Sequence, residues 1–168
     1  IDAAIYFDEK QPSQLYCQDI MSEAIVPVCS PEYAKEFDLI DNINNLAQCT
    51  LLHDNQAWGY DSNADEWELW ANNFNINSLD ASASISFDRS DLAVVAATNN
   101  AGVAMGRQSL IQRQIDKGEL IKPFVDKKLI CPQRYYVATL SNNKNTKIEL
   151  FIDWLKSEVR NEESKLVA

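Results

Sequence analysis

The chain has 168 residues, of which 46% are hydrophobic and 24% are charged, an ordinary composition for a globular protein. Its 15 Lys and Arg residues against 25 Asp and Glu residues give a formal net charge of −10, which argues against binding nucleic acid or an anionic membrane through clustered positive charge. No apolar run is long enough for a membrane-spanning helix, and no basic-then-apolar leader opens the sequence.

The first half of the chain predicts short strands, one capped helix and a long polar loop. Residues 1–7 form an apolar run typical of a buried strand, and its abrupt start leads us to expect a fragment of a longer protein. Ser30 followed by Pro31 is a strong helix-start signal, so a short helix is predicted over 31–36. The other predicted elements here are strands at 15–20, 24–29 and 50–53, helical turns at 43–48, and polar loops at 8–13 and 54–64.

The second half alternates helices with strands. Trp67, Trp70 and Phe74 share one stripe and predict a helix over 65–74. Ser90 as N-cap predicts a helix over 91–98, and Gly118 ends a predicted amphipathic helix over 109–117. The remaining predicted elements are strands at 82–87, 102–106, 120–124 and 135–140, a helix at 147–159, and a polar tail at 161–168.

This alternation predicts an α/β fold with mostly parallel sheets. Residues 27–122 hold 14 acidic and 6 basic side chains, whereas the remainder holds 11 and 9. A central insert of different surface character indicates two lobes. We therefore predict lobe one over 1–26, lobe two over 27–120 and a return to lobe one over 121–160, followed by the tail.

The four cysteines and the single histidine do not form a metal-binding pattern, because no two cysteines stand at Cys-x-x-Cys spacing. We expect four buried thiols in a reducing cytoplasm, with no metal and no cofactor. These residues are Cys17, Cys29, Cys49, Cys131 and His53.

No constellation in the sequence is typical of an enzyme. A Ser-His-Asp or Cys-His relay would have to use His53, whose neighbour Asp54 projects to the opposite face of a strand. Neither a Gly-x-Ser-x-Gly elbow nor a glycine-rich phosphate loop occurs. We therefore predict that the chain is not an enzyme.

Strand-to-helix junctions are the remaining candidates for a site, because ligands of open α/β sheets lie beyond the carboxyl ends of strands. Helix N-termini there offer free N–H groups and partial positive charge, which favour a carboxylate. Arg89 adds a cation for the same carboxylate, and Asp8, Asp54 or Asp88 would hold an ammonium group. This combination suits a small amino acid. The three junctions are residues 28–31, 52–54 and 87–90.

Each candidate also has a purely structural interpretation. Ser30 and Ser90 would serve as helix caps in any case. Arg89 is equally a surface cation on an acidic protein, His53 is equally a strand-end partner of the backbone, and Asp8 is equally the opener of a turn.

Six motifs, taken in order, resemble the effector-binding domain of LysR-type transcriptional regulators. The resemblance covers residues 1–155. The motifs are Val26-Pro-Val-Cys-Ser-Pro-Glu-Tyr-Ala34, Leu51-Leu-His-Asp54, Phe87-Asp-Arg-Ser-Asp-Leu-Ala93, Gly102-Val-Ala-Met-Gly-Arg107, Gly118-Glu-Leu-Ile-Lys-Pro-Phe124 and Phe151-Ile-Asp-Trp-Leu155.

The resemblance implies a two-lobed domain similar to periplasmic binding proteins, with a small-molecule effector between the lobes. It implies that DNA is bound only through a winged helix-turn-helix absent from this chain, that the first strand and helix of lobe one are missing, and that the protein forms homodimers or homotetramers. Within the family the resemblance is greatest to activators of D-serine deaminase genes, which favours D-serine as the effector.

By resemblance, nine residues line the effector site, and we expect Ser30 to converge there with residues 87–90. The alternative function is that of a periplasmic-type solute-binding protein for a small amino acid, and a third is an amino-acid hydrolase. The nine residues are Asp8, Ser30, His53, Asp54, Phe87, Asp88, Arg89, Ser90 and Tyr135.

Overall fold

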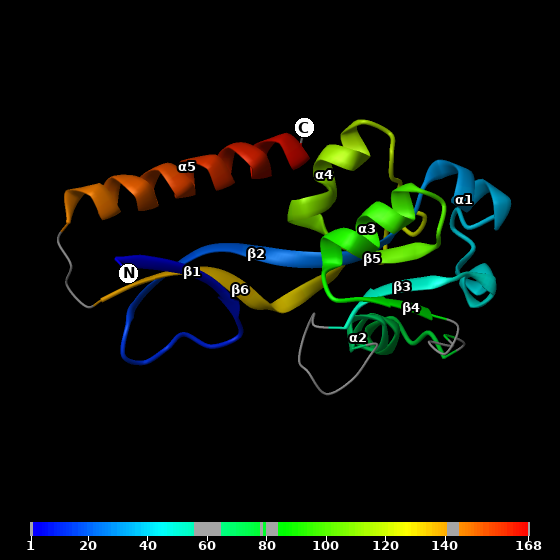
Figure 1. Cartoon of the computed structure of the whole chain (residues 1–168), viewed down its shortest axis with the longest axis horizontal. Coiled ribbons are helices and arrows are strands. Elements are labelled where there is room, and N and C mark those ends of the chain that lie inside the picture. Colours follow the sequence, from blue (N-terminus) through cyan, green and yellow to red (C-terminus); the bar gives the residue numbers. More distant parts are fainter. Residues whose placement is uncertain (1, 56–64, 78, 80–83, 141–144, 168) are drawn as a thin grey trace. The chain divides into compact units, whose positions relative to one another are not determined.

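The computed structural model describes residues 2–55, 65–77, 79, 84–140 and 145–167. Its internal contacts divide the chain into two compact units. Unit 1 contains Ile1–Glu23 and Cys131–Ala168, and unit 2 contains Ala24–Ile130 (Figure 1). The two-lobed α/β class predicted from the sequence is therefore present, with the division falling at residues 23/24 and 130/131.

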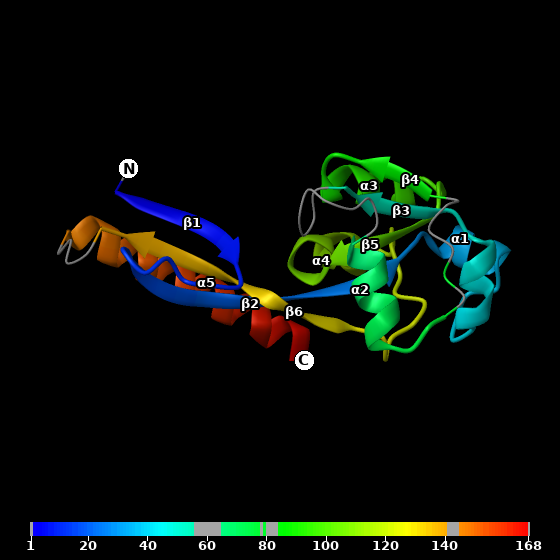
Figure 2. The same cartoon turned by 90° about the horizontal axis from the view of Figure 1, so that it is seen from below.

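Unit 1 is a group of strands covered on one face by a long helix. Strand β1 (Ala3–Asp8) pairs antiparallel with β6 (Leu129–Thr139), and β6 also neighbours β2 (Tyr16–Val28). Helix α5 (Thr146–Val167) lies along these strands (Figure 2). Its apolar stripe packs on the strands through a small core that contains Val137, Ile148 and Ile152, with Ala3, Ile20 and Leu155 at its border.

Unit 2 has a mixed sheet in the order β2-β5-β3-β4. Strand β3 (Leu51–Asp54) pairs parallel with both β4 (Ser84–Phe87) and β5 (Val103–Arg107), whereas β2 pairs antiparallel with β5. The prediction of mostly parallel sheets therefore holds for β5-β3-β4 alone. It is wrong for the β2–β5 and β1–β6 pairs.

Helices cover both faces of the parallel strands in unit 2. Helix α3 (Ser90–Thr98) lies on one side of β3 and β4, and α2 (Asp65–Asn73) lies on the other (Figure 1). Helix α4 (Gln108–Asp116) follows β5 directly. The α1 helix (Pro31–Glu36) and the 3-10 helix η1 (Ile43–Gln48) connect β2 to β3.

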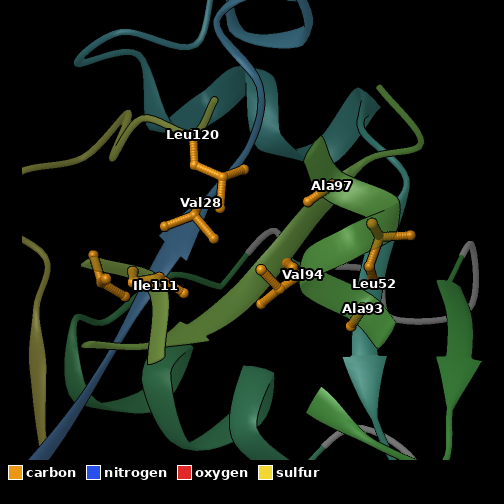
Figure 3. Close-up of a cluster of buried hydrophobic side chains, with 9 residues drawn as sticks. Val28, Leu52, Ala93, Val94, Ala97, Ile111 and Leu120 are labelled. Carbon is orange, nitrogen blue, oxygen red and sulfur yellow. The ribbon is translucent and has the colours of Figure 1, made fainter. Parts of the chain in front are cut away.

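The core of unit 2 lies between α3, α4 and the sheet. Small residues on α3 let the helix approach Leu52 closely, and Ile111 of α4 fills the space beside Val28 (Figure 3). Phe87 packs against the border of this core. The buried cluster consists of Val26, Val28, Leu52, Ala93, Val94, Ala97, Ala104, Ile111 and Leu120.

Several element boundaries differ from the sequence-based expectation. The strands predicted at 15–20 and 24–29 are one continuous strand, β2, which belongs to unit 1 up to Glu23 and to unit 2 from Ala24. The strand predicted at 120–124 is only a single bridge between Ile121 and Cys29. Residues 121–130, predicted to return to lobe one, belong to unit 2, where Phe124 packs near Trp70 at 6.3 Å between ring centroids.

Two further expectations concern the chain's end and its loops. Helix α5 continues to Val167, so the residues predicted as a polar tail from 161 extend the helix instead. Most of the predicted loop at 54–64 and the start of the strand predicted at 82–87 lie outside the described residues.

All four cysteines are free thiols, and Cys29, Cys49 and Cys131 are buried as predicted. Cys17, near the start of β2, is only half-buried, and its Sγ accepts a hydrogen bond from the Tyr6 hydroxyl at 3.2 Å. Burial, with the nearby Cys49 thiol, raises the pKa of Cys29 to about 12, and burial raises that of Cys49 to about 11. These two thiols therefore stay protonated at neutral pH.

We predict that Leu52→Ala lowers the free energy of unfolding by about 2–5 kcal/mol, because Leu52 is fully buried between α3 and the sheet. The matched control is Leu110→Ala on α4, where the leucine is 53% exposed and the expected loss is under about 0.5 kcal/mol. Urea unfolding followed by circular dichroism measures both. Equal losses for the two variants would contradict this placement of the core.

Candidate ligand-binding site

The carboxyl ends of β3, β4 and β5 lie at one edge of unit 2, because these three strands are parallel neighbours. Asp54, Phe87 and Arg107 end the three strands. Helices α3 and α4 begin directly after β4 and β5, so their first N–H groups, which lack intrahelical partners, lie at this edge. We refer to it as the carboxyl edge.

Asp54 and Phe87 lie opposite each other across β3 and β4 and share a face of the sheet. Leu52 packs in the α3 core, and side chains alternate along a strand, so Asp54 projects to the same face as Leu52. Phe87 packs against that core as well. The backbone N–H of Asn55 donates to the Phe87 carbonyl at 2.9 Å, which ties the two strand ends together. Asp54 thus lies beside the segment that leads into α3.

Arg89 occupies the N-cap position of α3 in an extended conformation, one residue before the predicted cap Ser90. Its guanidinium donates to both carboxylate oxygens of Asp91, with Nε to Oδ1 at 2.9 Å and a terminal nitrogen to Oδ2 at 2.5 Å. These hydrogen bonds raise the pKa of Arg89 and lower the pKa of Asp91. Both side chains and Asp88 are exposed, so this part of the edge faces solvent.

His53 lies on the opposite face of the sheet from Asp54. It is 1% exposed, and its Nε2 lies 3.1 Å from the hydroxyl oxygens of both Ser84 and Ser86. Its Nδ1 is buried and has no hydrogen-bond partner among the described residues. Burial lowers the pKa of His53, and the neighbouring Asp54 carboxylate opposes this shift. The imidazole is therefore neutral at pH 7, and it lies on the face that α2 covers.

Ser30 does not lie at the carboxyl edge. Because β2 runs antiparallel to β5, the end of β2 lies beside the beginning of β5, with Val28 opposite Ala104. The Ser30 hydroxyl accepts from the Tyr33 N–H at 3.0 Å and donates to the Asn100 side chain, which follows the end of α3. Ser30 and Ser90 are thus at opposite ends of a nine-residue helix, which spans about 13 Å. The expected convergence of Ser30 with residues 87–90 is wrong, and Ser30 is a buried helix cap.

Asp8 and Tyr135 belong to unit 1, whereas the other seven predicted site residues belong to unit 2. Asp8 is exposed, and its Oδ1 accepts from the N–H groups of Glu9 and Lys10 at 2.6 and 3.2 Å, which opens a turn. The Tyr135 ring packs against Phe7 with 4.7 Å between centroids. Their participation in an effector site stays a prediction.

Three polar side chains near the carboxyl edge are not among the nine residues predicted to line the effector site. Asn55 Oδ1 and Gln108 Oε1 are buried acceptors with no hydrogen-bond partner among the described residues. Glu66 of α2 is 3% exposed, and its Oε1 accepts from the Asp54 N–H at 2.8 Å. The signal for Gln108 was available, because the predicted strand at 102–106 and the following helix form a fourth strand-to-helix junction. Nothing in the sequence pattern points to Glu66.

The described residues contain no group of three or more His, Cys, Asp or Glu side chains arranged to hold a metal ion. None of the described helices combines the length and the apolar character that a membrane span requires.

The sequence model described as the LysR substrate binding domain matches residues 1–160. The chain belongs to this family. The HTH-type transcriptional regulator DsdC of Escherichia coli K12 is 51% identical over 160 residues, which are 95% of this chain and 51% of that protein. The glycine cleavage system transcriptional activator of the same strain is 26% identical over 98% of this chain and 52% of that protein. The chain thus spans about half the length of these relatives.

Solved LysR-family effector domains share the fold. The effector domain of AmpR from Pseudomonas aeruginosa matches with a TM-score of 0.78 and 24% identity, over 100% of this chain and 77% of that one. The AmpR effector-binding domain from Citrobacter freundii matches with a TM-score of 0.75 and 21% identity, over 96% and 76%. This similarity confirms the predicted periplasmic-binding-protein-like architecture of a LysR effector domain.

We predict that acid destabilises the protein in part through His53. Histidine in the unfolded state has a pKa of about 6.5, and the pKa of folded His53 is lower. Below about pH 6.5 the unfolded state therefore binds a proton that the folded state does not. The stability contributed by neutral His53 is complete above that pH and is lost as the pH falls toward the folded pKa. Urea unfolding at pH 7.5 and pH 5 should show a smaller acid loss in His53→Gln than in the unmodified protein. An identical loss in both would contradict the buried neutral imidazole.

Proposed function

We propose that the chain is the effector-sensing domain of a cytoplasmic LysR-type transcriptional activator that controls a gene of amino-acid catabolism. The relatives named above are a regulator described as HTH-type and an activator of the glycine cleavage system, which supports a regulatory role rather than enzymatic catalysis. They also support the regulator over the alternative of a solute-binding transport protein. The sequence resemblance to activators of D-serine deaminase genes favours D-serine as the effector.

The arrangement of charge at the carboxyl edge carries this proposal. Arg89 and the first turn of α3 supply positive charge and N–H donors for a carboxylate. Asp54, on the same face as Phe87 at the adjoining strand end, supplies a carboxylate for an ammonium group. Asn55 and Gln108 contribute buried oxygen acceptors for the ammonium or hydroxyl hydrogens. A small hydroxy amino acid presents these complementary groups.

Four other residues predicted to line the effector site lie beside Asp54 and Arg89 in the structure, and each has a role that follows from its position. Phe87 provides an apolar wall beside Asp54, and Asp88 adds negative charge at the exposed start of the α3 segment. Ser90 lies in the first turn of α3, where its N–H is available to a carboxylate. His53 acts from the other face of the sheet, where it fixes the β3–β4 pair through Ser84 and Ser86.

Regulation requires that the effector bind one arrangement of the protein better than another. A shift from mostly one state to mostly the other needs several kcal/mol of differential affinity. We propose that DNA is contacted only by a winged helix-turn-helix outside this chain, in a homodimer or homotetramer, and that no membrane is involved.

Isothermal titration calorimetry with D-serine and L-serine tests the proposal. We expect D-serine to bind more tightly than L-serine, and Asp54→Asn to weaken D-serine binding by at least about tenfold through loss of a charge-assisted contact. Glu119→Gln is the matched control, because Glu119 is an exposed carboxylate of unit 2 that pairs with Lys117 at 3.4 Å. Equal affinity for the two enantiomers would contradict a D-serine site, and unchanged affinity in Asp54→Asn would contradict the assigned edge.

A further inference from the structure

The Arg89 guanidinium already binds the carboxylate of Asp91, which lies in the first turn of the same helix. The Arg89–Asp91 pair is bidentate, with both Asp91 oxygens hydrogen-bonded to the guanidinium at 2.9 and 2.5 Å. This is the geometry in which a guanidinium binds the carboxylate of an amino acid. A free amino acid that uses Arg89 must therefore either share the guanidinium or displace Asp91.

Displacing Asp91 from Arg89 costs little free energy, because the ion pair is exposed to solvent. The Arg89 and Asp91 side chains are 67% and 52% exposed, so solvent screens their attraction. Exposed ion pairs contribute little to stability, and a released Asp91 remains in the first turn of α3, where the helix N-terminus still favours a negative charge. The closed pair and the opened pair therefore differ little in free energy.

We propose that Asp91 is an internal competitor for the effector's carboxylate, and that effector binding exchanges the Asp91 carboxylate on Arg89 for that of the ligand. This inference rests on the proposed function and adds to it a residue that sets affinity without contacting the bound effector. Asp91 lowers the apparent affinity, because part of the ligand's binding free energy is spent on opening the pair.

The exchange also selects among ligands. A ligand that approaches Arg89 without a carboxylate cannot replace the two hydrogen bonds that Asp91 makes, so the guanidinium stays with Asp91. Asp91 therefore lowers the apparent affinity only of ligands whose carboxylate binds Arg89, and it does not compete with analogues that lack a carboxylate.

The test is calorimetric titration of the protein and of Asp91→Asn with D-serine and with D-serinamide, in which the carboxylate is replaced by a neutral amide. Asp91→Asn should bind D-serine about two- to fivefold more tightly, the range expected when an exposed ion pair no longer competes. D-serinamide keeps its ammonium group and is a cation, so its affinity should not rise in Asp91→Asn. In an Arg89→Gln background, Asp91→Asn should give no gain.

Glu32→Gln is the matched control, because Glu32 is an exposed first-turn carboxylate of α1 in the same unit, and its removal changes the net charge equally. An unchanged or weaker affinity of Asp91→Asn for D-serine would overturn the competitor role while leaving the proposed function intact. Equal gains for D-serine and D-serinamide would show that the effect does not depend on the ligand's carboxylate and would overturn the competitor role. The same gain in Glu32→Gln would assign the effect to net charge and would overturn it as well. Failure of both the unmodified protein and Asp91→Asn to bind D-serine would instead contradict the proposed function, and the inference would fall with it.

Discussion

The antiparallel pairing of β2 with β5 determines which residues of unit 2 can meet. It places the end of β2 at the beginning of β5, and the parallel register of β3 with β4 and β5 then gathers the other three strand ends at the opposite edge. Ser30 consequently caps α1 at one end of α3, while Asp54, Arg89 and Arg107 lie toward the other. A strand of the same sequence paired in the parallel sense would have put Ser30 with them.

Side chains alternate between the two faces of β3, so the adjacent residues His53 and Asp54 have different roles. His53 lies beneath α2 and joins β3 to β4 through two serine hydroxyls, whereas Asp54 lies on the α3 face. Glu66 of α2 accepts a hydrogen bond from the Asp54 N–H at the same strand end. Buried His53 and Glu66 thus hold the ends of β3 and β4 in place on the face opposite the exposed charges of the candidate site.

Much of this organisation could be predicted from local signals. The Ser30-Pro31 start, the helix around Ala93 and the α/β alternation all depend on neighbouring residues, and the structure contains each of them. Strand direction could not be predicted, because it depends on how the chain returns through distant elements, and the Ser30 assignment failed for that reason. Glu66 could not be predicted, because its role follows from burial beside β3, which is separated from it in the sequence. Gln108 directly follows β5, so its strand-to-helix junction is a local signal. The Arg89–Asp91 pair is local, but its bidentate geometry depends on the extended conformation of Arg89.

The central claim is that a ligand binds at the carboxyl edge of β3, β4 and β5, and hydrogen–deuterium exchange with and without saturating D-serine tests it most directly. We expect slower exchange of the backbone amides at residues 54–55 and 88–92, where the strand ends and the first turn of α3 meet the ligand. Exchange at residues 30–34 and 99–101, which lie at the other end of α3, should not change. Protection confined to that opposite end, with none at the carboxyl edge, would contradict the account.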